Sequence, residues 1–176
     1  MNKNLIPVAS IPSTGKDFTL NYPDILDEEL KEFHMDCNIF DTCTVFINVL
    51  PTKEGCLIKG NLHGKITIPC NRCAEETIQS LDSQFTDLIA FPDDDTNENE
   101  NSGHIFNDSG TMFLNLSSIC WEEFVLAIPV SPLCKEDCKG LCNQCGTNLN
   151  ENQCSCKKES YDSRFAILRN LSLQKR

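Results

Sequence analysis

The chain has 176 residues, of which 40% are hydrophobic, and this is enough for one domain with a buried core and at most a small appendage. No apolar run approaches the ~18 residues that a membrane-spanning helix needs, which argues against a spanning protein. The net charge of −11 argues against a protein that coats nucleic acid nonspecifically, because that function requires a basic surface.

The first ninety residues predict mainly β-strands. After an apolar opening segment, residues 18–33 predict a short helix or an irregular edge. Residues 37–50 are rich in β-branched and aromatic side chains and end at Pro51, which is typical of a strand followed by a breaker. A turn at 53–55 then leads into a returning strand over 56–64.

Two runs of alternating apolar and polar residues flank the motif Cys70-Asn71-Arg72-Cys73. Ile66 and Ile68 precede the motif, and a longer run from Ile78 to Phe91 follows it. Alternation with a period of two on both sides predicts a β-hairpin with the cysteines at its tip.

Residues 92–111 predict a mobile acidic loop, because the stretch 92–101 has no apolar side chain to bury and carries only negative charge. A helix that Ser117 or Ser118 can cap is predicted next, and Pro129 ends it. The segment after the helix is rich in cysteine and loop-like, and a last amphipathic helix is predicted to begin at Asp162.

These elements predict an α+β fold: an antiparallel β-sheet or partial barrel with a short helix, a cysteine-rich zinc-binding segment and a C-terminal helix. We expect a mainly β domain over 1–131 and the cysteine-rich segment with its terminal helix over 132–176. The charge is uneven, since residues 92–131 contain eight acidic side chains and no Lys or Arg, whereas residues 132–176 carry a balance of +3.

Twelve cysteines are many for a chain that opens without an apolar signal segment and that we therefore expect in the cytoplasm. A reducing cytosol keeps thiols for metal binding or catalysis and not for disulfides. Eight of the cysteines form closely spaced pairs, which suit the four tetrahedral ligands of zinc. The pairs are Cys70-x2-Cys73, Cys134-x3-Cys138, Cys142-x2-Cys145 and Cys154-x-Cys156.

The pairs divide most simply into two zinc sites. Cys142 and Cys145, followed by Gly146, have the form of a zinc knuckle, and Cys154 and Cys156 can complete this first site. The remaining pairs then form a second site, which joins the hairpin tip to the segment after the helix; its ligands are Cys70, Cys73, Cys134 and Cys138. A competing arrangement places the two central pairs, from Cys134 to Cys145, on one ion.

The composition of these sites favours a structural role and no enzyme activity. All eight ligands are thiolates, whereas catalytic zinc keeps an open position for water and commonly has a His or carboxylate ligand. A redox role for the hairpin cysteines is disfavoured, because a thioredoxin-type motif opens a helix and here a strand follows. The three histidines are scattered and lack an evident nucleophile partner. The other cysteines are expected to be small core residues: Cys37, Cys43, Cys56 and Cys120.

Several motifs follow one another in a distinctive order from residue 70 to residue 165. They are Cys70-Asn71-Arg72-Cys73, Leu126-Ala127-Ile128-Pro129, Pro132-Leu133-Cys134, Cys138-Lys139-Gly140-Leu141-Cys142, Cys145-Gly146, Cys154-Ser155-Cys156 and Asp162-Ser163-Arg164-Phe165. This order resembles the large ribosomal RNA subunit accumulation protein family, the YceD type, over about residues 40–172. The family usually has proline where this chain has Ser163, and the change should loosen the start of the last helix without altering its role.

The resemblance implies a role in the accumulation of large-subunit ribosomal RNA through its processing, stability or assembly, with no established catalytic residues. An acidic body suits a basic large-subunit ribosomal protein as partner. Direct contact with pre-ribosomal RNA is the second possibility, through Arg72, Lys157, Lys158 and Arg164. A third interpretation is a zinc-dependent regulator or metal store unrelated to ribosomes. We expect neither a membrane nor a small-molecule substrate as partner.

Overall fold

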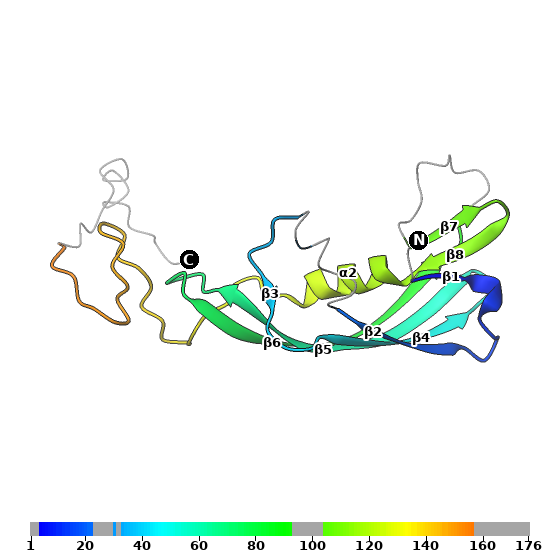
Figure 1. Ribbon diagram of the computed structural model, residues 1–176, viewed down its shortest axis with the longest axis horizontal. Coiled ribbons are helices and arrows are strands. Elements are labelled where there is room, and N and C mark those ends of the chain that lie inside the picture. Colours follow the sequence, from blue (N-terminus) through cyan, green and yellow to red (C-terminus); the bar gives the residue numbers. More distant parts are fainter. Residues whose placement is uncertain (1–3, 23–29, 31–32, 93–103, 157–176) are drawn as a thin grey trace, which may run out of the picture.

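The computed structural model describes residues 4–22, 30, 33–92 and 104–156. Antiparallel β-strands dominate this part of the chain, with one α-helix, so the α+β class with few helices is confirmed. The elements are β1 Leu5–Pro7, the 3₁₀ turn η1 Val8–Ser10, β2 Lys16–Asn21, β3 Asn38–Ile39, β4 Thr44–Pro51, β5 Gly55–Pro69, β6 Glu76–Ala90, β7 Ile105–Asp108, β8 Thr111–Asn115 and α2 Leu116–Ala127 (Figure 1). The predicted C-terminal helix and most of the segment 18–33 lie outside the described residues.

The larger sheet is built on the long hairpin of β5 and β6. The two strands pair over fifteen residues without a break, and Cys70 and Cys73 lie at the hairpin's tip, as the alternating pattern predicted. On its other side β5 pairs with β4 and, nearer the tip, with β3, while β2 pairs with β4. Along β5 the even-numbered side chains from Cys56 to Ile66 face the core and the odd-numbered ones face solvent.

A second sheet corrects the predicted acidic loop. Residues 92–111 were expected to form one mobile loop, but β7 and β8 form a hairpin that includes 105–111. Ser109 and Gly110 have φ values of 52° and 85°, as the favoured two-residue turns of hairpins require. The sequence prediction was wrong here because β7 is only four residues long. The rest of the predicted loop, 93–103, lies outside the described residues.

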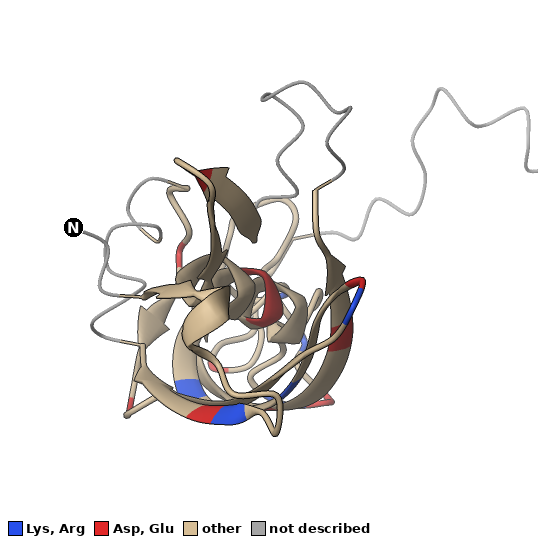
Figure 2. Cartoon of the chain, turned by 90° about the vertical axis from the view of Figure 1, so that its right-hand side faces the viewer, with Lys and Arg blue, Asp and Glu red and all other residues tan. Residues whose placement is uncertain are grey.

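Helix α2 lies against the inner face of the larger sheet, which curves around it (Figure 2). Asn115 caps the helix by accepting a hydrogen bond from the backbone N–H of Ser118, so the cap lies two or three residues before the predicted serines. The helix ends at Ala127, just before Pro129, as predicted. Its buried side chains are Leu116, Ile119, Cys120 and Phe124.

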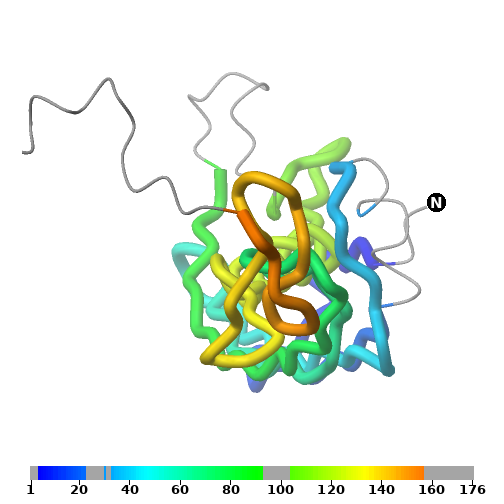
Figure 3. The backbone as a smooth tube through the Cα atoms, turned by 90° about the vertical axis from the view of Figure 1, so that its left-hand side faces the viewer, coloured from blue at the N-terminus to red at the C-terminus, as the bar shows by residue number. Residues whose placement is uncertain are grey.

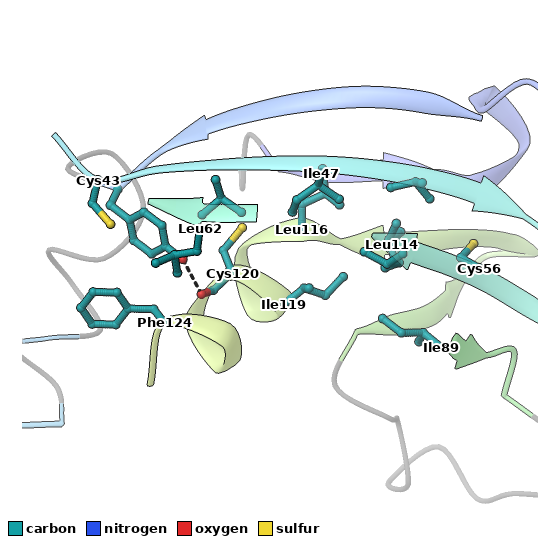
Figure 4. Packing of buried hydrophobic residues seen from close by; sticks show 14 of the residues in the cluster. Cys43, Ile47, Cys56, Leu62, Ile89, Leu114, Leu116, Ile119, Cys120 and Phe124 are labelled. Atoms are coloured by element: carbon teal, nitrogen blue, oxygen red, sulfur yellow. Dashed lines mark hydrogen bonds between the residues drawn. The ribbon is translucent and has the colours of Figure 1, made fainter. Parts of the chain in front are cut away.

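The core lies between α2 and the two sheets (Figure 4). The four cysteines that were expected in the core are buried there, and desolvation raises the pKa of Cys37 and Cys43 to about 11. Tyr22 is fully buried, packs on Phe124 and donates its hydroxyl proton to the carbonyl of Cys120 at 2.7 Å. Among the described residues, no helix has the length and apolar character needed to cross a membrane.

The hydrogen bond from Tyr22 gives a test of this packing. Tyr22→Phe keeps the ring but removes this buried hydrogen bond, and we expect a loss of about 1 kcal/mol in the free energy of unfolding. Thr19→Val is the control, because the Thr19 side chain is exposed and its loss should change stability by less than about 0.5 kcal/mol. Urea unfolding followed by circular dichroism measures both. Equal effects of the two changes would contradict the packing described here.

Candidate metal centres

Four cysteines meet where the β5–β6 hairpin touches the loop after α2; we call this group the tip site. Its sulfur atoms all lie within 4.8 Å of one another and belong to Cys70, Cys73, Cys134 and Cys138. The Cys70 and Cys138 sulfurs are 3.8 Å apart, and those of Cys73 and Cys134 are 3.6 Å apart. In a tetrahedral site with metal–sulfur bonds of about 2.3 Å, neighbouring sulfurs are about 3.8 Å apart. The spacing therefore fits one tetrahedral metal ion.

A second group of four lies within the cysteine-rich segment; we call it the knuckle site. Its sulfur atoms also lie within 4.8 Å of one another and belong to Cys142, Cys145, Cys154 and Cys156. The structure thus groups the paired cysteines four and four, and it does not bring together the competing set from Cys134 to Cys145. Figure 3 shows the segment that carries both loops, in yellow and orange, lying over the end of the hairpin.

The two sites share one backbone motif. The N–H of Ala74 donates to the carbonyl of Cys70, and the N–H of Gly146 donates to the carbonyl of Cys142, both at 2.9 Å. In each motif the N–H of the first cysteine also donates, at 2.9 Å, to the carbonyl five residues later. Ala74 and Gly146 have φ values of 60° and 71°. The hairpin tip is therefore a second zinc-knuckle turn, which the sequence did not reveal because alanine stands where the left-handed conformation favours glycine.

In each group, hydrogen bonds lower the pKa of one cysteine and so favour its thiolate form, which is the form that binds a metal cation. The hydroxyl and the N–H of Thr147 lower the pKa of Cys145 to about 6, and Cys145 in turn raises the pKa of Cys156 to about 12. At the tip site desolvation opposes ionisation, yet backbone N–H groups, first that of Arg72, lower the pKa of Cys70 to about 6. Each group can thus hold thiolate charge at neutral pH, and full ionisation of all four thiols requires a cation between them.

Arg72, which was a candidate for RNA contact, bonds within the chain. Its Nη1 atom donates to the carbonyl of Cys138 at 2.9 Å and to that of Glu136 at 3.3 Å. Its own carbonyl accepts from the N–H of Leu141 at 3.0 Å. A Cβ atom on Gly140 would lie 2.9 Å from that carbonyl, so only glycine allows this close approach. Arg72 therefore holds the loop that supplies half of the tip site.

Asn150 connects the two sites. It lies in the loop between the pairs of the knuckle site, and its Nδ2 atom donates to the sulfur of Cys138 in the tip site at 3.3 Å. Its Oδ1 atom accepts from the backbone N–H of Lys139 at 2.9 Å. A single side chain therefore links the loop of the knuckle site to a cysteine of the tip site, so that an ordered knuckle loop helps to hold Cys138 in place.

The remaining candidates are placed as follows. The predicted RNA-contact residues Lys157, Lys158 and Arg164 lie outside the described residues. His104, which was expected to lack a nucleophile partner, lies between Ser118 and Glu122, at 2.8 Å from the Ser118 hydroxyl and 2.7 Å from the Glu122 carboxylate. The Ser118 hydroxyl donates to the carbonyl of Asn115, which ties this group to the first turn of α2. Sequence reasoning missed it because fourteen residues separate His104 from Ser118.

Comparison with known proteins identifies the family. Residues 58–172 match the family described as large ribosomal RNA subunit accumulation protein YceD, so the chain belongs to that family. An uncharacterized protein of Mycobacterium tuberculosis is 30% identical over 125 residues, which cover 69% of this chain and 58% of that protein. The chloroplastic large ribosomal RNA subunit accumulation protein YCED homolog 1 of Arabidopsis thaliana is 28% identical over 155 residues, covering 74% of this chain and 48% of the homolog.

A maize protein with the same description is 28% identical over 142 residues, which cover 64% of this chain and 48% of that protein. The chain thus spans about half the length of the curated relatives that it matches. No solved structure matches it.

The equivalence of the two knuckle turns can be tested with opposite substitutions at their matching positions, Ala74 and Gly146. Ala74→Gly removes the penalty of a left-handed alanine, and we expect it to raise the free energy of unfolding of the metal-loaded protein by about 1 kcal/mol. Gly146→Ala introduces the same penalty where no atom lies within 4 Å of the added Cβ, and it should lower stability by a similar amount. Urea unfolding measures both. A loss of stability in Ala74→Gly would show that the two turns are not equivalent.

Proposed function

We propose that this YceD-family protein is a non-enzymatic factor that supports the accumulation of large-subunit ribosomal RNA, with two structural zinc ions and an acidic body that binds a basic large-subunit ribosomal protein. The observation that carries the choice of partner is the charge distribution. Residues 73–134, which include β6, β7, β8 and α2, contain twelve Asp and Glu and no Lys or Arg. Such a surface attracts a basic protein and repels the phosphates of RNA.

Zinc is the metal that the ligand sets support best. Four thiolates in tetrahedral arrangement are typical of structural zinc or of iron–sulfur proteins. The two knuckle turns, with backbone N–H groups near the sulfurs, are the usual surroundings of a single zinc ion. Four thiolates complete the coordination of zinc and leave no open position for water, which supports a structural role in place of catalysis.

The burial of the tip site favours a structural ion over a stored one. Cys70, Cys73 and Cys138 are each about 3% exposed, and Leu133 packs against them. Release of this ion would separate the hairpin from the loop that follows α2, because the ligands are drawn from both. A metal store or a metal-sensing regulator needs a site that opens at small cost, and the knuckle site, with one exposed and two partly exposed ligands, is closer to that description.

Zinc content and ligand variants test the first half of the proposal. Protein purified from zinc-supplemented medium should contain about two zinc ions, measured by mass spectrometry of the metal. Cys142→Ser should lower this to about one and leave the sheets folded. Cys70→Ser should also leave about one ion but should reduce stability further, because it releases a link between distant segments.

Cys120→Ala is the control for these variants, since Cys120 belongs to the core and should not change the zinc content. One ion in the wild type that is unaffected by Cys70→Ser would contradict a metal-bound tip site. Iron in place of zinc would contradict the choice of metal.

Nuclease and salt separate the two candidate partners. A tagged protein should recover a basic large-subunit protein from cell extract, and recovery should survive nuclease treatment. Its binding to an isolated ribosomal RNA fragment should be weak. If instead the RNA fragment binds directly and its affinity falls steeply with salt, the RNA is the partner. For a single strand, each phosphate contacted lowers the logarithm of the binding constant by about 0.7 for a tenfold rise in salt concentration.

A further inference from the structure

Strand β6 has an open edge along its whole length. It pairs with β5 on one side through fifteen consecutive residue pairs, from Glu76 to Ala90. No strand in the described part of the chain pairs with its other side. β6 is thus a border strand of the larger sheet, and α2 lies over the inner face of that sheet (Figure 1). This border is much longer than the usual strand of five or six residues.

The register tells which backbone groups face this edge. The N–H of Phe91 donates to the carbonyl of Glu54, and the carbonyl of Glu75 accepts from the N–H of Cys70, so odd-numbered residues direct their backbone toward β5. In an antiparallel pair the intervening residues point the other way. The even-numbered residues of β6 therefore present eight N–H and eight C=O groups at the open edge, and the side chains of all eight are exposed. No described backbone group bonds to them.

The edge lacks most of the usual protection against strand addition. Proteins commonly guard such edges with proline, lysine, bulges or very short strands. Between residues 76 and 90 there is no Pro, Gly, Lys or Arg, and the pairing with β5 contains no bulge. An edge of this length and regularity is a template for another strand.

The charge on β6 selects the kind of strand. Glu76 and Asp82 lie on its outer face, and Asp87 lies near Glu123 of α2. Within the described chain, none of these carboxylates forms an ion pair with Lys or Arg. Desolvation and the charges of Glu122 and Asp87 raise the pKa of Glu123, which shows that the carboxylates beside β6 repel one another. A second copy of β6 would add to this repulsion, whereas a basic strand would relieve it.

Apolar side chains complete the pattern on the outer face. Ile78 and Leu88 are 50% and 52% exposed, and both belong to the even-numbered set whose backbone faces the edge. Cross-strand neighbours on the same face interact, so an added strand gains by placing apolar side chains opposite these two and basic ones opposite Glu76 and Asp82.

We propose that the open edge of β6 binds an extended segment of a partner polypeptide, rich in Lys and Arg with apolar residues between, which adds to the sheet as a further antiparallel or parallel strand. The site deepens the proposed function, since it names the surface on which the basic partner binds. Main-chain hydrogen bonds supply affinity in this mode of recognition, and the side chains opposite the partner supply selectivity.

Amide hydrogen exchange tests strand addition directly. The probe is a twelve-residue peptide that repeats Lys-Lys-Val-Val, so that each face of its strand carries both Lys and Val, and it is added to the zinc-loaded full chain and followed by NMR. We expect the amides of even-numbered β6 residues such as Ile78, Asp82 and Gln84 to exchange more slowly once the peptide is bound, while odd-numbered amides, already bonded to β5, stay unchanged. The same peptide with every backbone amide N-methylated is the matched control, and it should give no protection, because methyl groups then block strand pairing at both of its edges.

Two variants of Gln84 distinguish the contribution of its backbone N–H to peptide binding from that of its side chain. Gln84→Pro removes an N–H that faces the edge without removing a bond to β5, and it should weaken binding of the peptide about tenfold. Gln84→Ala keeps the N–H and should bind within about twofold of the wild type. Asp82→Lys should weaken binding, whereas Asp17→Lys, the same charge change on β2, should have a smaller effect.

The outcomes distinguish this site from the proposed function. Equal binding of the N-methylated peptide, or no protection of the even-numbered amides, would overturn strand addition even if charge attracts the peptide. If Gln84→Pro still recovers the basic large-subunit protein from extract as well as Gln84→Ala does, the result supports the proposed function and contradicts binding at the β6 edge. If Gln84→Pro does not fold, the exchange measurement on the wild type decides alone.

Discussion

The architecture depends on one long-range constraint: two sulfurs at a hairpin tip and two sulfurs more than sixty residues later meet at distances that fit one tetrahedral ion. The fifteen-residue ladder of β5 and β6 carries Cys70 and Cys73 to the end of the sheet. Helix α2 returns the chain along the inner face and delivers Cys134 and Cys138 to the same end. The bonds of Arg72 and the close approach of Gly140 then fix the loop on the tip without further secondary structure.

The grouping of the cysteines could be predicted from the sequence because it depends mainly on the short spacing within each pair. Pairs separated by one to three residues meet on turns whatever the rest of the fold does, and alternation on both sides of Cys70 and Cys73 indicates a hairpin. The features that were missed depend on contacts between distant residues. The strand β7 is short and is stabilised by Phe106 stacking on Phe113 of β8 with ring centroids 5.9 Å apart. The role of Arg72 depends on carbonyl groups that only the folded loop brings near it.

The two candidate metal centres are linked by hydrogen bonds. The segment after α2 has little regular secondary structure, so its order depends on turns, hydrogen bonds to sulfur and the bridge between Leu141 and Asn148. Asn150 bonds across from one site to the other. An ion in the knuckle site would thus stabilise a loop that also supports Cys138, and an ion in the tip site would anchor the whole segment to the sheet. This explains how a segment with few apolar side chains can hold a fixed position.

The open edge of β6 and the cysteine-rich segment meet at the same end of the molecule. Glu75, immediately before β6, accepts a hydrogen bond from Asn148 in the knuckle loop, and Gln79 within β6 donates to the carbonyl of Leu133. A strand added along β6 would therefore end beside the cysteine-rich segment, whose position the metal sites determine. The acidic strand and the cysteine-rich loops would then be two parts of one surface: the strand would supply main-chain groups and negative charge, and the loops would limit how far the proposed partner chain can extend. A metal ion in the tip site would act at a distance in this arrangement, because it would hold the end of the sheet in the form that the proposed partner meets.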